Sequence, residues 1–145
     1  MSLTKNTKIT RIAASAIAAQ TDVASSILDM SGFDGVTFIA LTGDVTDTSA
    51  LALKCEENDA NSAVGMAELV GSAGFTAGVS TADNKAIVLD VYKPRKRYVR
   101  AVLERGLANA VVDGIIAIQY GARNVPTSHD ASVIASALLN DPSEV

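Results

Sequence analysis

The sequence has few of the residues that carry chemistry. Its 145 residues include one histidine, one cysteine and no tryptophan. One cysteine cannot form an internal disulfide, and one cysteine with one histidine gives too few ligands for the usual zinc sites. His129 lies between Ser128 and Asp130, but adjacency along the chain does not create the converging geometry of a catalytic triad. Cys55 falls in an expected strand, where we interpret it as a buried structural thiol. We therefore expect no enzyme activity, no cofactor and no metal site.

Charge is also scarce. Charged residues make up 19% of the chain, below the usual quarter, and the formal net charge is -4. Nucleic-acid-binding proteins usually have the opposite balance, because release of counterions from phosphates drives their affinity. No apolar run approaches the roughly 18 residues that a membrane helix needs. So few charges leave apolar surface in water, which is more favourable against another protein. We therefore expect protein partners, and neither nucleic acid nor membrane.

Only 4% of the residues are aromatic, so the core must be built from Ala, Val, Ile and Leu. From residue 23 the apolar residues alternate with a period of two, which is typical of half-buried strands. Expected strands, separated by turn residues, are 23–30, 36–41, 50–56, 75–79, 85–92, 97–104 and 110–120, with a short strand or helical turn at 66–70. The alternation predicts that four large apolar residues lie in the core: Phe38, Leu53, Leu89 and Ile116.

Seven or eight short strands without long helices between them predict an all-β, antiparallel β-sandwich. The fold is either jelly-roll-like or immunoglobulin-like on this evidence. The pair of cysteines around a tryptophan that marks immunoglobulin domains is missing, which favours the jelly roll.

The two ends of the chain are expected to be arms outside the sandwich, which gives the boundaries 1–22, 23–126 and 127–145. Apolar residues from Ile9 to Ile17 have helical spacing, so the first arm forms either a short helix or an extended segment. In the second arm, Asp130 could cap a helix whose apolar stripe includes Ile134 and Leu138. Short helices are marginal in water without packing, so we expect this arm to pack on a neighbouring molecule.

One run of positive charge follows Tyr92: Lys93, Pro94, Arg95, Lys96 and Arg97. It is interpreted as an exposed turn, as a contact for an acidic protein partner or as a contact for nucleic acid. The net negative charge favours the first two alternatives over the third. The candidate partner contacts are Lys93, Arg95, Lys96, Arg97, Ile134 and Leu138.

Four segments resemble those of small virion proteins of tailed bacteriophages. They are Ile27 to Phe38, containing Asp29-Met30-Ser31-Gly32-Phe33-Asp34; Leu53 to Asp59; Lys96-Arg97-Tyr98-Val99-Arg100; and Gly114 to Tyr120 with the exit Gly121-Ala122-Arg123-Asn124-Val125-Pro126. Their order and spacing across residues 23–126 are more specific than any one motif, whereas residues 1–22 and 127–145 match no part of the pattern.

The resemblance implies a jelly-roll cement, or decoration, protein. Such a protein is made in the bacterial cytoplasm, lies on the capsid surface of the virion and ties major capsid subunits together. Its partners would be the major capsid protein and further copies of itself, as dimers or trimers. One alternative is a head-tail connector or tail structural protein with a sandwich fold. Another is a carbohydrate-binding sandwich, although the absence of tryptophan removes the usual platform for stacking a sugar.

Overall fold

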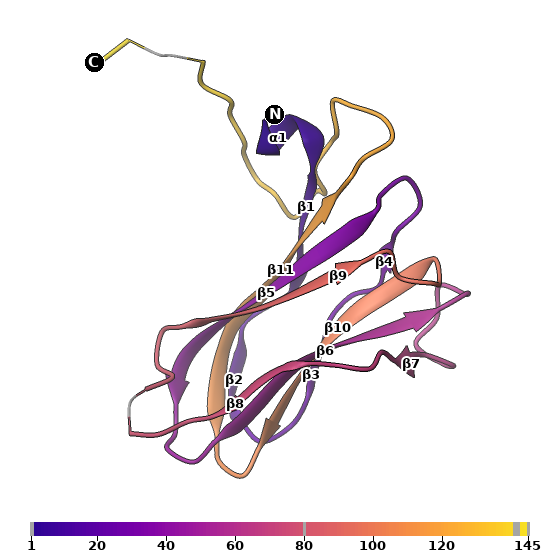
Figure 1. The fold of residues 1–145 in the computed structure, drawn as a ribbon. Helices are drawn as coiled ribbons and strands as arrows, with labels where there is room; N and C mark the ends of the chain where they lie inside the picture. The colour runs from indigo at the N-terminus through magenta and orange to yellow at the C-terminus, as the bar shows by residue number, and fades with distance from the viewer. Residues whose placement is uncertain (1, 80, 141–142, 145) are drawn as a thin grey trace.

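The computed structural model describes residues 2–79, 81–140 and 143–144 and shows two antiparallel sheets packed face to face (Figure 1). The elements in chain order are α1 (Leu3–Asn6), β1 (Lys8–Ala13), β2 (Ala16–Ala19), β3 (Val23–Ala24), β4 (Leu28–Asp29), β5 (Gly35–Val45), β6 (Ala50–Asn58), β7 (Ala67–Glu68), β8 (Ala73–Thr76), β9 (Ala86–Tyr92), β10 (Tyr98–Gly106) and β11 (Ala110–Tyr120).

The connectivity is that of a jelly roll. In one sheet the order is β1-β11-β5-β9, and β2 continues β1 along β11. In the other sheet β10 and β6 lie side by side, β3 and β4 pair with β10, and β7 and β8 pair with β6. When each interrupted pair counts as one strand, eight strands form the orders 1-8-3-6 and 2-7-4-5, and the chain changes sheet at every connection except that between strands 4 and 5. The all-β, jelly-roll-like prediction is confirmed, because this is the double Greek key that closes such sandwiches.

The core lies between the sheets and is built mostly from aliphatic side chains. Phe38 and Leu53 are fully buried, as predicted, and Leu89 is half-buried against them. The prediction that Ile116 is a core residue is wrong: Ile116 is half-buried on the outer face. A β-bulge between Val112 and Gly114 shifts the register, so that Ile115 points inward instead. Alternation could not decide this, because both faces of β11 carry isoleucine.

The N-terminal segment is part of the sandwich, and of the two alternatives expected between Ile9 and Ile17 the structure has the extended one and not the short helix. Lys8–Ala13 and Ala16–Ala19 are strands paired with β11, and Ile12 is buried in the core. The helical spacing arose from apolar residues on both sides of a strand whose inward residues are Thr10 and Ile12. The sheet therefore begins at residue 8, well before the expected boundary at residue 22.

The helix that Asp130 could have capped is not formed in residues 131–140, the part of this segment that the structure describes without a gap. The Asp130 carboxylate accepts the backbone N–H of Ser132, and this local turn replaces a helix cap. Residues 127–132 instead lie along the free edge of β1, which would otherwise expose unpaired backbone groups. The first contact is to α1, from Thr127 N–H to Lys5 O. The next three alternate along β1: Ile9 N–H to His129 Nδ1, Asp130 N–H to Ile9 O and Arg11 N–H to Ser132 Oγ.

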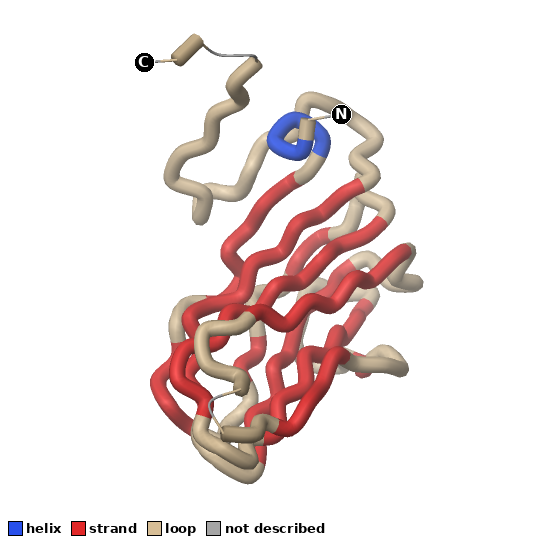
Figure 2. Tube along the Cα trace, turned by 60° about the vertical axis from the view of Figure 1, so that its left-hand side comes forward, coloured by secondary structure: helices blue, strands red, loops and turns tan. Residues whose placement is uncertain are grey.

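Beyond this edge the chain leaves the body of the molecule (Figure 2). We call residues 133–140 the tail. The tail contains no helix or strand, and all of its residues except the half-buried Val133 are exposed.

Candidate interaction surfaces

The residues that could bind a metal or act as a nucleophile are dispersed, buried or already hydrogen-bonded. Among the described residues, no group of three or more His, Cys, Asp or Glu side chains could hold a metal ion. His129 uses Nδ1 to bind the backbone of Ile9 at 3.1 Å. Burial, helped by the charges of Glu57 and Glu56, raises the pKa of Cys55 to about 12, so this thiol is protonated at neutral pH. In the described part of the chain, no helix is long and apolar enough to cross a membrane.

The basic run forms the turn between β9 and β10. Lys93 has a positive φ of 51°, which lets the chain reverse directly after Tyr92. The turn is held by the buried carboxylate of Glu57, whose Oε2 accepts the backbone N–H groups of Arg95 at 3.1 Å and Lys96 at 3.2 Å. Glu57 therefore holds the backbone of the turn that carries the cationic side chains.

Sequence reasoning missed this role of Glu57. The signal that could have found it is its position in β6, where Leu51, Leu53, Cys55 and Glu57 share the inward face. An acid that continues an apolar face needs hydrogen-bond donors.

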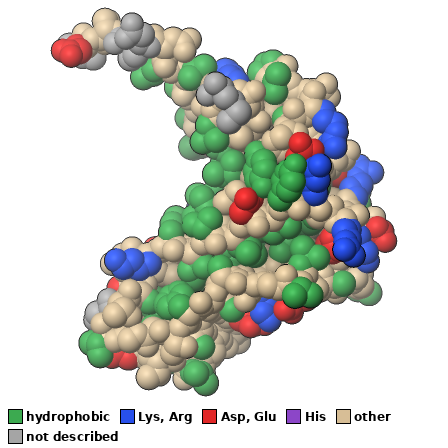
Figure 3. Space-filling model, viewed as in Figure 1, with side chains coloured by type: hydrophobic (Ala, Val, Ile, Leu, Met, Phe, Trp, Pro, Cys, Tyr) green, Lys and Arg blue, Asp and Glu red, His purple; other side chains and the backbone are tan. Residues whose placement is uncertain are grey.

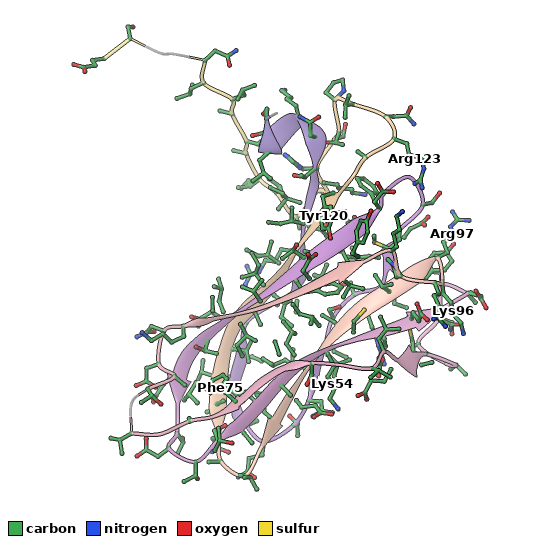
Figure 4. The ribbon with its side chains drawn as sticks, viewed as in Figure 1. Lys54, Phe75, Lys96, Arg97, Tyr120 and Arg123 are labelled. Carbon is green, nitrogen blue, oxygen red and sulfur yellow. The ribbon has the colours of Figure 1, made fainter. Side chains whose placement is uncertain are left out.

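The turn lines a cavity of about 410 Å³ together with the β4–β5 loop and the segment after β11. We call this cavity the basic pocket, defined by its cations Lys93, Arg95, Lys96, Arg97 and Arg123. Figure 4 labels Lys96, Arg97 and Arg123, which project at one end of the sandwich.

Three of the five cations in the basic pocket have carboxylate partners. Arg97 donates two hydrogen bonds of 2.9 Å to Asp29, and the guanidinium lowers the pKa of that carboxyl. Lys96 Nζ lies 4.0 Å from a carboxylate oxygen of Asp59, and Arg123 Nη2 lies 3.6 Å from one of Asp34.

Lys93 and Arg95 are the cations most available to a partner. Lys93 Nζ lies 5.2 Å from the centre of the Tyr92 ring. Within the described residues, neither side chain forms a salt bridge. A carboxylate from another molecule could pair with either one.

The structure separates the other two sequence candidates from this pocket. Ile134 and Leu138 lie on the tail, and neither lines the basic pocket. The molecule therefore offers the tail and the basic pocket as two distinct candidate contacts.

A third surface was not expected from the sequence. The outer side of β1-β11-β5-β9, here called the apolar face, is formed by Ile9, Ile39, Leu41, Val88, Ile116 and Ile118. Ile116, Ile39 and Val88 are opposite one another on three adjacent strands. Figure 3 shows hydrophobic side chains gathered in the hollow between the tail and the body.

The outer side of the second sheet is different and is called the charged face. Lys54 Nζ lies 2.7 Å from Glu104 and 2.9 Å from Glu68, across two strand pairs. Arg100 donates to Glu56 at 2.6 Å. These ion pairs leave few charges on this face without a partner.

Comparisons with known proteins support the fold and do not assign a family. No family model and no curated protein matches the sequence. A chain in the structure of infectious bursal disease virus, Gx strain, superposes with a TM-score of 0.51 at 11% identity, covering 84% of this chain. This chain spans about a third of that chain's length, 34%.

A chain of Eiger TNF from S. frugiperda superposes with a TM-score of 0.38 at 10% identity, over 81% of this chain and 99% of that one. This second likeness is too weak to support an argument. The first shows that the sandwich fold occurs in a chain of a viral structure.

Proposed function

We propose that this protein is a structural protein of a virus particle, and specifically a cement protein that binds the outside of a bacteriophage capsid. It would have no catalytic role and would reinforce contacts between major capsid subunits. One observation carries the proposal. The segments that resemble phage virion proteins are distant in sequence, but parts of them meet around the basic pocket.

The convergence is specific to one end of the sandwich. Met30 to Asp34, Lys96 and Arg97, and Arg123 come from three of those segments and line the same cavity. The fourth segment supplies Glu57, which holds the β9–β10 turn. The same segments also supply core residues such as Phe38, Leu53 and Ile115, and their turns and exits are arranged around a partly exposed pocket. The viral chain with a similar sandwich is compatible with this role and bears on the fold alone.

The proposed contact pairs Lys93 and Arg95 with carboxylates on capsid subunits. Arginine is well suited to such contacts, because its planar guanidinium forms two parallel hydrogen bonds to a carboxylate. The neighbouring Tyr92, which is largely exposed, supplies apolar area beside the charges. A contact of this kind weakens as salt screens the charges.

The test is binding of purified protein to undecorated capsids. We expect saturable binding with many copies spread over the shell, and at least a tenfold loss of affinity for Lys93→Glu with Arg95→Glu. The matched control is Lys5→Glu with Lys85→Glu, which makes the same change of charge away from the basic pocket. Equal loss in both double variants would show that net charge and not this contact controls binding. No binding by the unaltered protein would overturn the proposal.

The positions of the bound copies on the particle distinguish this function from the alternative of a head-tail connector or tail protein. A connector forms one symmetric ring, whereas a cement protein decorates the whole shell. Labelled protein visible at a single vertex would therefore favour the connector.

A further inference from the structure

The chain carries an apolar surface and an apolar segment that do not cover each other. On the apolar face, Val88 is 54% exposed and Leu41 is 37% exposed, while Ile39, Ile116 and Ile118 are half-buried. Charged residues flank this row: Arg11 on β1 and Asp90 on β9. Contiguous apolar surface of this kind usually marks a contact with another molecule.

The tail has matching chemistry. Between Ala131 and Asn140 the chain has no charged residue. Ile134 is fully exposed, Leu139 is 71% exposed and Leu138 is 42% exposed. Docking this segment on the apolar face would bury large aliphatic side chains on both sides, and the tail would bring no charge of its own into the contact.

The tail begins at the border of the apolar face. Ser132 is tied to β1 by the bond from Arg11 N–H to Ser132 Oγ, at 2.8 Å. Ser132 and Val133 line a cavity of about 300 Å³ together with Ile9, Leu41 and Ile116. From this border the tail runs away from its own sheet (Figure 1).

The tail is long enough to cross a whole sheet face. Its eight residues span about 26 Å when extended, at roughly 3.3 Å per residue. The distance from β1 to β9 is three strand spacings, about 14 Å at roughly 4.8 Å each. A tail that leaves one molecule can therefore reach across the apolar face of a second molecule related by a two-fold axis.

We infer that the apolar face is the docking surface for the tail of a second copy of this chain, with the two tails exchanged. In a two-fold pair each copy gives its tail and receives one, so the same contact is made twice. The anchor formed by residues 127–132 stays on its own β1 edge, and only residues 133–140 pass to the partner. This inference does not depend on the proposed function, and it is tested without capsids.

The first test measures the molecular mass of the full chain by sedimentation equilibrium across a concentration series. We expect a dimer for the unaltered protein and a monomer for a chain ending at Ser132. Val88→Glu should weaken association at least tenfold, because it places a charge on the most exposed residue of the row Ile116, Ile39 and Val88, at the β9 edge of the apolar face. Val64→Glu makes the same substitution at an exposed loop site outside that face and should leave the mass unchanged. A monomeric unaltered protein, or a dimer that survives both the truncation and Val88→Glu, would overturn the inference.

The second test identifies the occupant by disulfide cross-linking in a Cys55→Ser background. One chain carries Ile134→Cys and a second, lengthened by a tag, carries Val88→Cys. We expect the mixed disulfide to exceed several-fold the product formed when Val64→Cys replaces Val88→Cys. Equal yields would overturn the inference. Closure within one chain that carries both cysteines, at high dilution, would show that each tail covers its own face and would also overturn it.

Discussion

The two outer faces of the sandwich differ although the same strand alternation builds both. The charged face satisfies its ions locally, through Lys54 between Glu68 and Glu104. The apolar face presents Ile116, Ile39 and Val88 in a row across three strands. An antiparallel sheet normally has one face in the core and a polar face in water. The charged face follows that rule and the apolar face departs from it, and this departure is what the proposed docking of a second copy would explain.

The largest expected effect is a difference in unfolding free energy between substitutions at two adjacent positions of β5, one in the core and one on the apolar face. Phe38 points into the core and is fully buried, whereas its neighbour Ile39 lies on the apolar face. We expect Phe38→Ala to lower the free energy of unfolding by about 3–5 kcal/mol, because it leaves a cavity in a packed interior. Ile39→Ala should cost clearly less in the monomeric chain that ends at Ser132. Urea unfolding of both variants measures the difference, and equal losses would mean that the apolar face is packed like a core.

A buried cation links the two sheets at the end opposite the basic pocket. Arg105 is buried, and its guanidinium donates to Thr21 O at 2.7 Å, Ile17 O at 2.8 Å and Ala110 O at 2.6 Å. Burial lowers the pKa of Arg105. Arg105→Met should lower the free energy of unfolding by about 2–4 kcal/mol, because three carbonyls lose a charged donor.

Arg100→Met is the matched control for this substitution, since it removes an arginine of the same strand from the charged face. Its loss of unfolding free energy should be smaller, because the Arg100–Glu56 pair is only partly buried and water can solvate the carboxylate that remains. A loss as large as that of Arg105→Met would show that Arg100 on the charged face stabilises the fold as much as the buried Arg105 does.

Cys55, on the inward side of the sheet that carries the charged face, gives a prediction that depends on pH. The pKa of Cys55 is raised from 9.0 to about 12 by burial. A raised thiol pKa favours the protonated native state, so this stabilisation is complete below pH 9 and is lost as the pH rises from about 9 to about 12. Over that window the free energy of unfolding should fall more steeply for the unaltered protein than for Cys55→Ala. At pH 8 a thiol reagent should modify Cys55 in urea and not in the native protein. Fast labelling of the native protein would show that the thiol is accessible.

Much of this arrangement could be predicted from period-two alternation, and the failures have identifiable causes. The strand expected at 110–120 has those bounds in the structure, because it is flanked by clear turn residues. Ile116 was misplaced because a bulge at Gly114 reverses the parity of the strand, and a sequence pattern does not contain that information. Strand β1 could not be assigned to the sheet from the sequence, since Ala-rich residues with isoleucine satisfy helical and extended spacing equally well.

The candidate contacts were predictable only in part. The basic turn followed from Lys93 to Arg97, because a run of charges must face water. Which cations are free depends on Asp29, Asp34 and Asp59, which distant segments bring to the turn. The apolar face could not be predicted for a similar reason. It joins residues of four strands whose order in the sheet is not their order in the sequence.

The smallest expected effect is a change in melting temperature when an ion pair of the charged face is removed. Lys54→Met removes the cation between Glu68 and Glu104, and these exposed carboxylates then lose their shared partner. We expect a small drop in melting temperature, because exposed ion pairs contribute little and water solvates the freed carboxylates. The drop should change with added salt, which screens the remaining repulsion.

Association should be unaffected by Lys54→Met even though the substitution adds apolar area. Sedimentation equilibrium beside Val88→Glu makes the contrast direct, since one variant makes the charged face more apolar and the other makes the apolar face charged. If Lys54→Met changed the mass as much as Val88→Glu, contact would depend on general surface hydrophobicity. If only Val88→Glu acts, the position of the apolar residues on β1-β11-β5-β9 determines the contact, as the difference between the two faces requires.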